Sequence, residues 1–169
     1  MKQESTHIEN LQSQFGTIHI QIRHQNEKFR EIGLIDQNDI LRTLAISKLN
    51  KEVLIEEYYA MHEDIKKGVA ISIALKKHNI DFNKSVESNF MIHIPKKLGL
   101  EFNNSSSLTS GQYSKIFICY DNKKSLYAEI LEIFHPLFKT NKTLHETGNA
   151  HVFKELIEKF NLVNYLIIN

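Results

Sequence analysis

Isoleucines alternate with polar residues near the start of the chain, in residues 17–23 (TIHIQIR). An apolar period of two is typical of a β-strand with one buried face. The stretches 29–35 (FREIGLI) and 40–49 (ILRTLAISKL) are also predicted to be strands, and short polar turns at 25–28 and 36–39 separate the three. Because these connections are too short for parallel crossovers, the first third of the chain is predicted to form an antiparallel meander.

Helical spacing of apolar residues replaces this alternation in the middle of the chain. Asn50 is a suitable cap for a helix that runs through residues 52–67 (EVLIEEYYAMHEDIKK). A second helix is predicted over residues 70–78 (AISIALKKH), and Asn79 ends it. Residues 81–95 fit no single period, and we interpret them as a strand followed by a short helix.

Two strongly alternating strands dominate the last third, residues 112–120 (QYSKIFICY) and 125–134 (SLYAEILEIF), with a polar hairpin turn between them. Small polar residues at 103–111 predict a surface loop before these strands, and Pro136 ends the second one. An amphipathic helix is predicted over residues 149–161. This order of elements predicts the α+β class, with an antiparallel sheet and helices packed on one face.

The composition supports one folded domain over residues 1–169. Hydrophobic residues make up 41% and charged residues 24%, which is typical of a soluble globular protein. The formal charge of +1 argues against a nucleic-acid-binding protein, since such proteins usually have a clear basic excess. The chain has no apolar run long enough for a membrane span, and its polar N-terminal stretch lacks the features of a signal peptide. We therefore expect a cytoplasmic protein.

Cysteine and histidine usage argues against a metal centre. Cys119 is the single cysteine, which excludes an intrachain disulfide framework and a multi-cysteine zinc site. The histidines at 145–151 (HETGNAH) do not match the His-Glu-x-x-His spacing of a zinc site. We therefore predict no bound metal, and the sequence leaves the oligomeric state open between monomer and dimer.

Three charged residues, Arg30, Arg42 and Glu132, lie within predicted apolar strands. Each either points to solvent from a one-sided sheet or lies in a polar cavity, because burying an unpaired charge is very unfavourable. In a cavity, two guanidinium groups suit carboxylates, and a glutamate can hold a hydroxyl or handle a proton. Such a set fits a small dianionic ligand that carries a hydroxyl, but the spacing leaves both alternatives open.

Two stretches of the chain resemble the chorismate lyase (chorismate pyruvate-lyase, 4-hydroxybenzoate synthase) family: FREIGLIDQNDILRTLAIS and SGQYSKIFICYDNKKSLYAEILEIFHP. The resemblance covers residues 5–136 and leaves 137–169 as a C-terminal extension. The motifs that carry it are, in order, Arg30-Glu31-Ile32, Arg42-Thr43, Gly111 to Ser114, Lys124 and Glu132-Ile133-Phe134-His135-Pro136.

This resemblance implies a six-stranded antiparallel sheet with helices on one face and an internal ligand cavity. It also implies a lyase that eliminates pyruvate from chorismate and leaves 4-hydroxybenzoate, a common supply step for ubiquinone biosynthesis. Arg30 and Arg42 would each face one carboxylate of chorismate, and Glu132 would lie by the ring hydroxyl and assist proton transfer. No organic cofactor is implied, because aromatisation drives the reaction.

The chain also departs from the family pattern. The family's middle helix has Pro and Gly where this chain has Val69-Ala70-Ile71-Ser72, and Asn83-Lys84-Ser85 lacks an arginine of the family. A non-catalytic domain that binds a small aromatic carboxylate is the alternative function, since UTRA ligand-binding domains of GntR-type regulators share this architecture. A third is an interaction domain whose cavity has degenerated. We expect the helix in the C-terminal extension to cover the sheet in place of the family's N-terminal helix.

Overall fold

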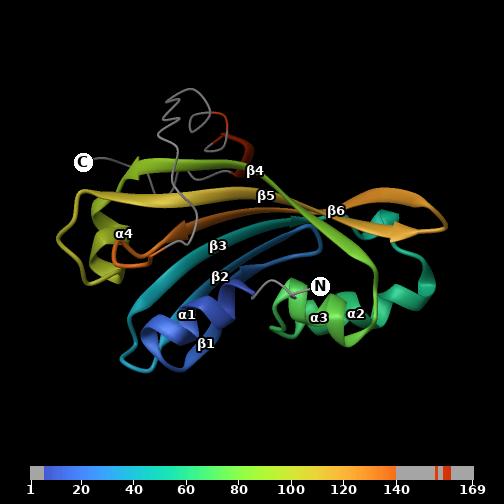
Figure 1. The fold of residues 1–169 in the computed structure, drawn as a ribbon, viewed down its shortest axis with the longest axis horizontal. Coiled ribbons are helices and arrows are strands. Elements are labelled where there is room, and N and C mark those ends of the chain that lie inside the picture. The colour runs from blue at the N-terminus through green and yellow to red at the C-terminus, as the bar shows by residue number, and fades with distance from the viewer. Residues whose placement is uncertain (1–5, 140–154, 156–157, 161–169) are drawn as a thin grey trace.

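The computed structural model describes residues 6–139, 155 and 158–160, and its dominant element is a six-stranded antiparallel sheet (Figure 1). The strands pair in the order β1-β2-β3-β6-β5-β4, so the N-terminal meander is joined to the other three strands through β3 and β6. The predicted α+β class and antiparallel sheet are confirmed. The strands are β1 (Ile18–Gln25), β2 (Phe29–Asp36), β3 (Leu41–Leu49), β4 (Phe82–His93), β5 (Leu108–Tyr120) and β6 (Lys123–Phe134).

Three helices lie along one side of the sheet: α1 (His7–Phe15), α2 (Tyr59–Lys66) and α3 (Ile71–Lys77) (Figure 1). A fourth short helix, α4 (Lys96–Glu101), follows β4. The interpretation of residues 81–95 as a strand followed by a short helix has the right order, but the strand fills most of that range and the helix begins only after it. Among the described residues, no helix is both long enough and apolar enough to cross a membrane.

Helix α1 was not predicted, although the sequence carries its signal. The Thr6 hydroxyl accepts a hydrogen bond from the Glu9 backbone N–H, and the Glu9 carboxylate accepts one from the Thr6 N–H. This reciprocal capping box satisfies two N–H groups that a helix start otherwise leaves unpaired. Gly16, at φ +79°, then ends the helix in a conformation that favours glycine. The pattern Thr-x-x-Glu therefore marks a helix that hydrophobic spacing alone did not reveal.

The predicted helix over 52–67 is only partly correct. Two short 3₁₀ turns, η1 (Lys51–Val53) and η2 (Glu56–Tyr58), precede α2. Leu54 and Ile55 between them are extended, and the Leu54 side chain is buried in the core. Burying Leu54 therefore takes precedence over continuing the helix. Similarly, the predicted loop over 103–111 ends early, because β5 already begins at Leu108.

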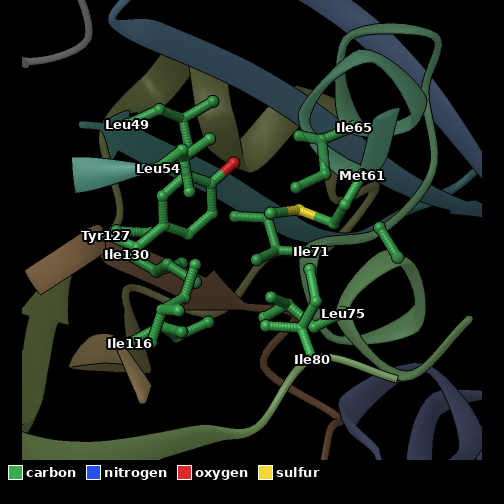
Figure 2. Close-up of a cluster of buried hydrophobic side chains, with 13 residues drawn as sticks. Leu49, Leu54, Met61, Ile65, Ile71, Leu75, Ile80, Ile116, Tyr127 and Ile130 are labelled. Carbon is green, nitrogen blue, oxygen red and sulfur yellow. The ribbon is translucent and has the colours of Figure 1, made fainter. Parts of the chain in front are cut away.

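Hydrophobic clusters fill both sides of the sheet. On the helix side, Met61 and Ile65 of α2 and Ile71 of α3 pack toward Tyr127 and Ile130 of β6 (Figure 2). A second cluster forms around alternate residues of β3 and β6 and includes helix α4: Leu44, Ile46, Leu131, Ile133, Leu98 and Phe102. Because side chains alternate along a strand, β3 and β6 contribute to both clusters.

Lys159 and Phe160 of the C-terminal extension pack on that second cluster. Phe160 is 1% exposed, and its ring lies 5.9 Å from the ring of Tyr113. The ammonium group of Lys159 forms an ion pair with Glu129 and donates a hydrogen bond to the Tyr113 hydroxyl. Residues 158–160 are helical, whereas most of the helix predicted over 149–161 lies outside the described residues.

Candidate functional site

A cavity of about 650 Å³ lies between the sheet and helices α1 and α3. Its volume falls within the range of small-molecule sites, which is about 300–1,000 Å³. Much of its wall is apolar and includes the rings of Phe82, Phe134 and Phe138. The charged and ionisable side chains that reach it are Arg30, Glu132 and His7, with Lys76, Lys84 and Lys139 at exposed positions.

Arg30 of β2 is 2% exposed and has no carboxylate partner among the described residues. Its Nη1 donates a hydrogen bond to the carbonyl of Val69 at 3.0 Å, while its buried Nε and Nη2 have no partner. Burial lowers the pKa of Arg30 to about 10. Tyr127 is close enough to act on this charge, but its hydroxyl is hydrogen-bonded to His62. One edge of a buried guanidinium in the cavity lining is therefore unpaired among the described residues.

Glu132 of β6 lies in the same cavity and is 7% exposed. Its Oε2 accepts a long hydrogen bond of 3.4 Å from Nζ of Lys84, which belongs to β4. Burial opposes ionisation of this carboxyl, but the positive charge of Lys84 and the nearby His7 outweigh it and lower its pKa below the usual value. Glu132 is therefore an anion at neutral pH, held by a single lysine.

The sheet register sets the spacing between Arg30 and Glu132. Arg30 pairs with Ser47 and Ser47 pairs with Ile130, two residues before Glu132 on β6. Two strand spacings and a two-residue step correspond to roughly 12 Å between the Cα atoms of Arg30 and Glu132.

His7 at the start of α1 is the fourth ionisable group of the cavity. Its Nε2 lies 2.9 Å from the hydroxyl of Thr43, and its ring contacts Phe134 and Phe138. Burial lowers the pKa of His7, so the imidazole is neutral at neutral pH. Helix α1 thus brings a polar but uncharged group to the end of the cavity near Glu132.

The structure does not bring Arg42 to this cavity. The register of β2 and β3 pairs Leu34 with Thr43 and Ile35 with Leu41, so Arg42 is the extra residue of a β-bulge. Its Nε and Nη2 donate to Oδ2 of Asp36 at 2.8 and 2.6 Å. Arg42 and Arg30 therefore do not bind one ligand together. The Nε and Nη2 groups of Arg42 are paired with the Asp36 carboxylate, whereas those of Arg30 have no partner among the described residues.

Further contacts hold Arg42 at the end of the sheet. Its guanidinium lies 4.2 Å from the ring centroid of Phe15 in α1. The Leu137 N–H donates to Nδ1 of His135, so the neutral imidazole carries its proton on Nε2 and donates to the Phe102 carbonyl at 2.9 Å. The Nη1 of Arg42, 3.1 Å from that Nε2, is then a close contact between two donors. The ion pair with Asp36 and the contact with the Phe15 ring therefore give Arg42 a structural role.

Two cavity residues were not among the predicted site residues. Lys84 lies in the segment that lacks an arginine of the family pattern, and this difference was the sequence feature that pointed to Lys84 as a site residue. His7 follows the capping residue of α1, and no local motif links it to a site on the sheet. Among the described residues, no group of three or more His, Cys, Asp or Glu side chains is arranged to hold a metal.

Comparison with known proteins supports the fold. No protein-family profile matches the sequence, and no curated protein matches it. The chain is similar to the crystal structure of PhnF from Mycobacterium smegmatis, with 10% identity and a TM-score of 0.58 over 86% of this chain and 70% of PhnF. A protein of Escherichia coli CFT073, provisionally described as a regulator, gives 10% identity and a TM-score of 0.44 over 75% and 98% of the two chains, too low to carry weight. The chain therefore shares the fold of PhnF.

Proposed function

We propose that this protein is a non-catalytic domain that binds a small aromatic carboxylate in the cavity beneath α1 and α3. The observation that carries the proposal is the buried guanidinium of Arg30, whose Nε and Nη2 have no partner among the described residues. Buried donors are almost always paired in native proteins, so an unpaired edge in a cavity wall calls for a ligand. A carboxylate matches that edge with two parallel hydrogen bonds.

The rest of the cavity supports an aromatic body for this ligand. Phe82, Phe134 and Phe138 line it together with aliphatic side chains, which suits a flat apolar ring. The fold shared with PhnF is common to UTRA ligand-binding domains and chorismate lyases, so it supports binding at least as well as catalysis. The placement of Arg42 favours binding, because the two-arginine arrangement implied for a lyase is not assembled.

Chorismate lyase activity is the second candidate. The observation in its favour is that Arg30 and Glu132, two of the three residues expected for that reaction, line the same cavity. If the protein is a lyase, Lys84 would have to supply the second positive charge in place of Arg42. The two candidates differ in whether bound chorismate is converted into 4-hydroxybenzoate and pyruvate.

One experiment separates them. The purified chain is incubated with chorismate while 4-hydroxybenzoate and pyruvate are followed, and binding of 4-hydroxybenzoate is measured by calorimetry. We expect binding without turnover, and at least about thirtyfold weaker binding for Arg30→Met, since losing a buried charge partner costs about 2 kcal/mol or more. Arg23→Met is the matched control, because Arg23 pairs with Glu101 and does not line the cavity.

The outcomes are distinct. Turnover of chorismate that disappears in Arg30→Met and Glu132→Gln would support the lyase and refute a purely binding role. Absence of both binding and turnover would refute both candidates. Equal affinity of the Arg30→Met and native proteins for 4-hydroxybenzoate would show that the carboxylate binds elsewhere.

A further inference from the structure

We propose that the Lys84–Glu132 ion pair selects the charge of the ligand, so that the cavity accepts a monocarboxylate with a hydrogen-bond donor at its far end and rejects a dianion. This inference rests on the proposed function and specifies the ligand class of the same site. It assigns Lys84 and Glu132 as specificity-determining residues.

The first step is a count of charges in the cavity. Arg30 has no carboxylate partner among the described residues, whereas Lys84 is paired with Glu132. His7 adds no charge at neutral pH, because burial lowers its pKa. Lys76 and Lys139 are exposed, and water and salt screen their charges. One uncompensated positive charge remains, which matches one carboxylate.

The second step concerns the carboxylate of Glu132. Among the described residues, Lys84 is its only side-chain partner, at Oε2 and at the long distance of 3.4 Å. The neighbouring Gln112 donates one N–H of its amide to Asn89 at 2.9 Å. A buried carboxylate has room for several donors, so a ligand hydroxyl or amine near Glu132 would supply a missing hydrogen bond.

The third step explains why a second carboxylate is unfavourable at this end. A ligand anion placed here would face Glu132, and the two negative charges would repel each other. If Lys84 turned to the ligand instead, Glu132 would be left buried without its partner. The protein carboxylate thus occupies the position that the second acid group of a dianion would need.

The test compares paired probes that differ only at the far end. Calorimetry at pH 7.5 would measure 4-hydroxybenzoate against terephthalate, and 3-(4-hydroxyphenyl)propanoate against 3-(4-carboxyphenyl)propanoate, so that two spacer lengths are covered. The native protein is expected to bind the better hydroxy acid at least about tenfold more tightly than its dicarboxylate partner, since one hydrogen bond to a charged group contributes about 1.5 kcal/mol or more.

Two variants probe the ion pair from either side. Glu132→Gln frees Lys84 and should reverse the order, so that the dicarboxylate binds more tightly than the hydroxy acid. Lys84→Gln leaves Glu132 without its cation and should favour 4-(aminomethyl)benzoate, whose ammonium group replaces the lysine. Glu87→Gln is the control, because Glu87, also on β4, pairs with Lys115 of β5 at 3.1 Å and does not line the cavity.

The results separate this inference from the function on which it rests. If the probes bind through Arg30 but rank the same in the native protein and in both ion-pair variants, charge selection by Lys84 and Glu132 is refuted while carboxylate binding stands. Charge selection is also refuted if the native protein binds the dicarboxylates more tightly than the hydroxy acids. If no probe binds the native protein, the proposed function fails and this inference fails with it. Circular dichroism of each variant confirms that it is folded.

Discussion

Replacing Arg30 by methionine is expected to stabilise the protein while it abolishes ligand binding. Burial lowers the pKa of Arg30 from 12.5 to about 10, which corresponds to a destabilisation of the charged form of roughly 3 kcal/mol. Methionine removes that penalty and keeps an unbranched apolar side chain. It also loses the hydrogen bond to the Val69 carbonyl, worth about 1.5 kcal/mol. The net expectation is a gain of about 1–2 kcal/mol, or roughly 2–8 °C in Tm.

Urea unfolding followed by circular dichroism, at pH 7.5 and without ligand, measures this difference directly. The variant should unfold at a higher midpoint than the native protein with an unchanged dependence on urea. The opposite result, a loss of 1 kcal/mol or more, would refute the reasoning, because it would mean that the guanidinium is satisfied within the folded chain. A stabilising substitution that removes binding is the pattern expected when a residue is kept for a ligand at the expense of stability.

Four further outcomes can be checked by unfolding measurements. Arg42→Met should lower stability by about 3–5 kcal/mol, because Asp36 stays buried without its partner, and should leave carboxylate binding intact once the protein is folded. Stability should be full above pH 6.5 and fall as the pH drops below it. The reason is that burial lowers the pKa values of His62 and His135 in the folded state, so the unfolded chain takes up protons first. Measuring Tm between pH 5 and 8 tests this, and His135→Gln should flatten the dependence of Tm on pH. Gly111→Ala should cost about 1–3 kcal/mol in urea unfolding, since its methyl group would lie 2.4 Å from the Phe90 ring and 2.8 Å from the Glu132 carbonyl oxygen. Phe160→Ala should cost about 3–5 kcal/mol if residue 160 covers the sheet as described, and an unchanged Tm would refute that packing.

Hydrophobic alternation was sufficient to predict the strands other than β4, because β-strands that bury one face repeat their apolar residues every second position. It also indicated the hairpin before β6, where Asp121 and Asn122 adopt positive φ angles of 46° and 59°. Helix α1 was missed because its apolar face is short and its evidence lies in the capping pair Thr6 and Glu9. Local periodicity reports which face is buried, whereas a capping box reports where a helix starts.

The candidate site was only partly predictable for a different reason. Arg30 and Glu132 could be selected as charged residues in apolar strands, and the structure places both in the cavity. Arg42 met the same criterion, but a one-residue bulge removes it from the regular pleat, and no periodicity predicts where a bulge falls. Lys84 lies on β4, the strand whose pattern was ambiguous, so neither its element nor its direction followed from the sequence.

Strand β6 lies between two different environments, and this has a consequence for mutagenesis. Ile130, Glu132 and Phe134 line the cavity, whereas Leu131 and Ile133 belong to the cluster that includes Phe160. A residue-by-residue scan along this strand would therefore read out two properties in alternation, ligand affinity at even positions and anchoring of the C-terminal segment at odd ones. Each step of about 3.3 Å along β6 thus passes from one face of the sheet to the other, and a phenotype that changed smoothly along β6 would be evidence of a different pleat.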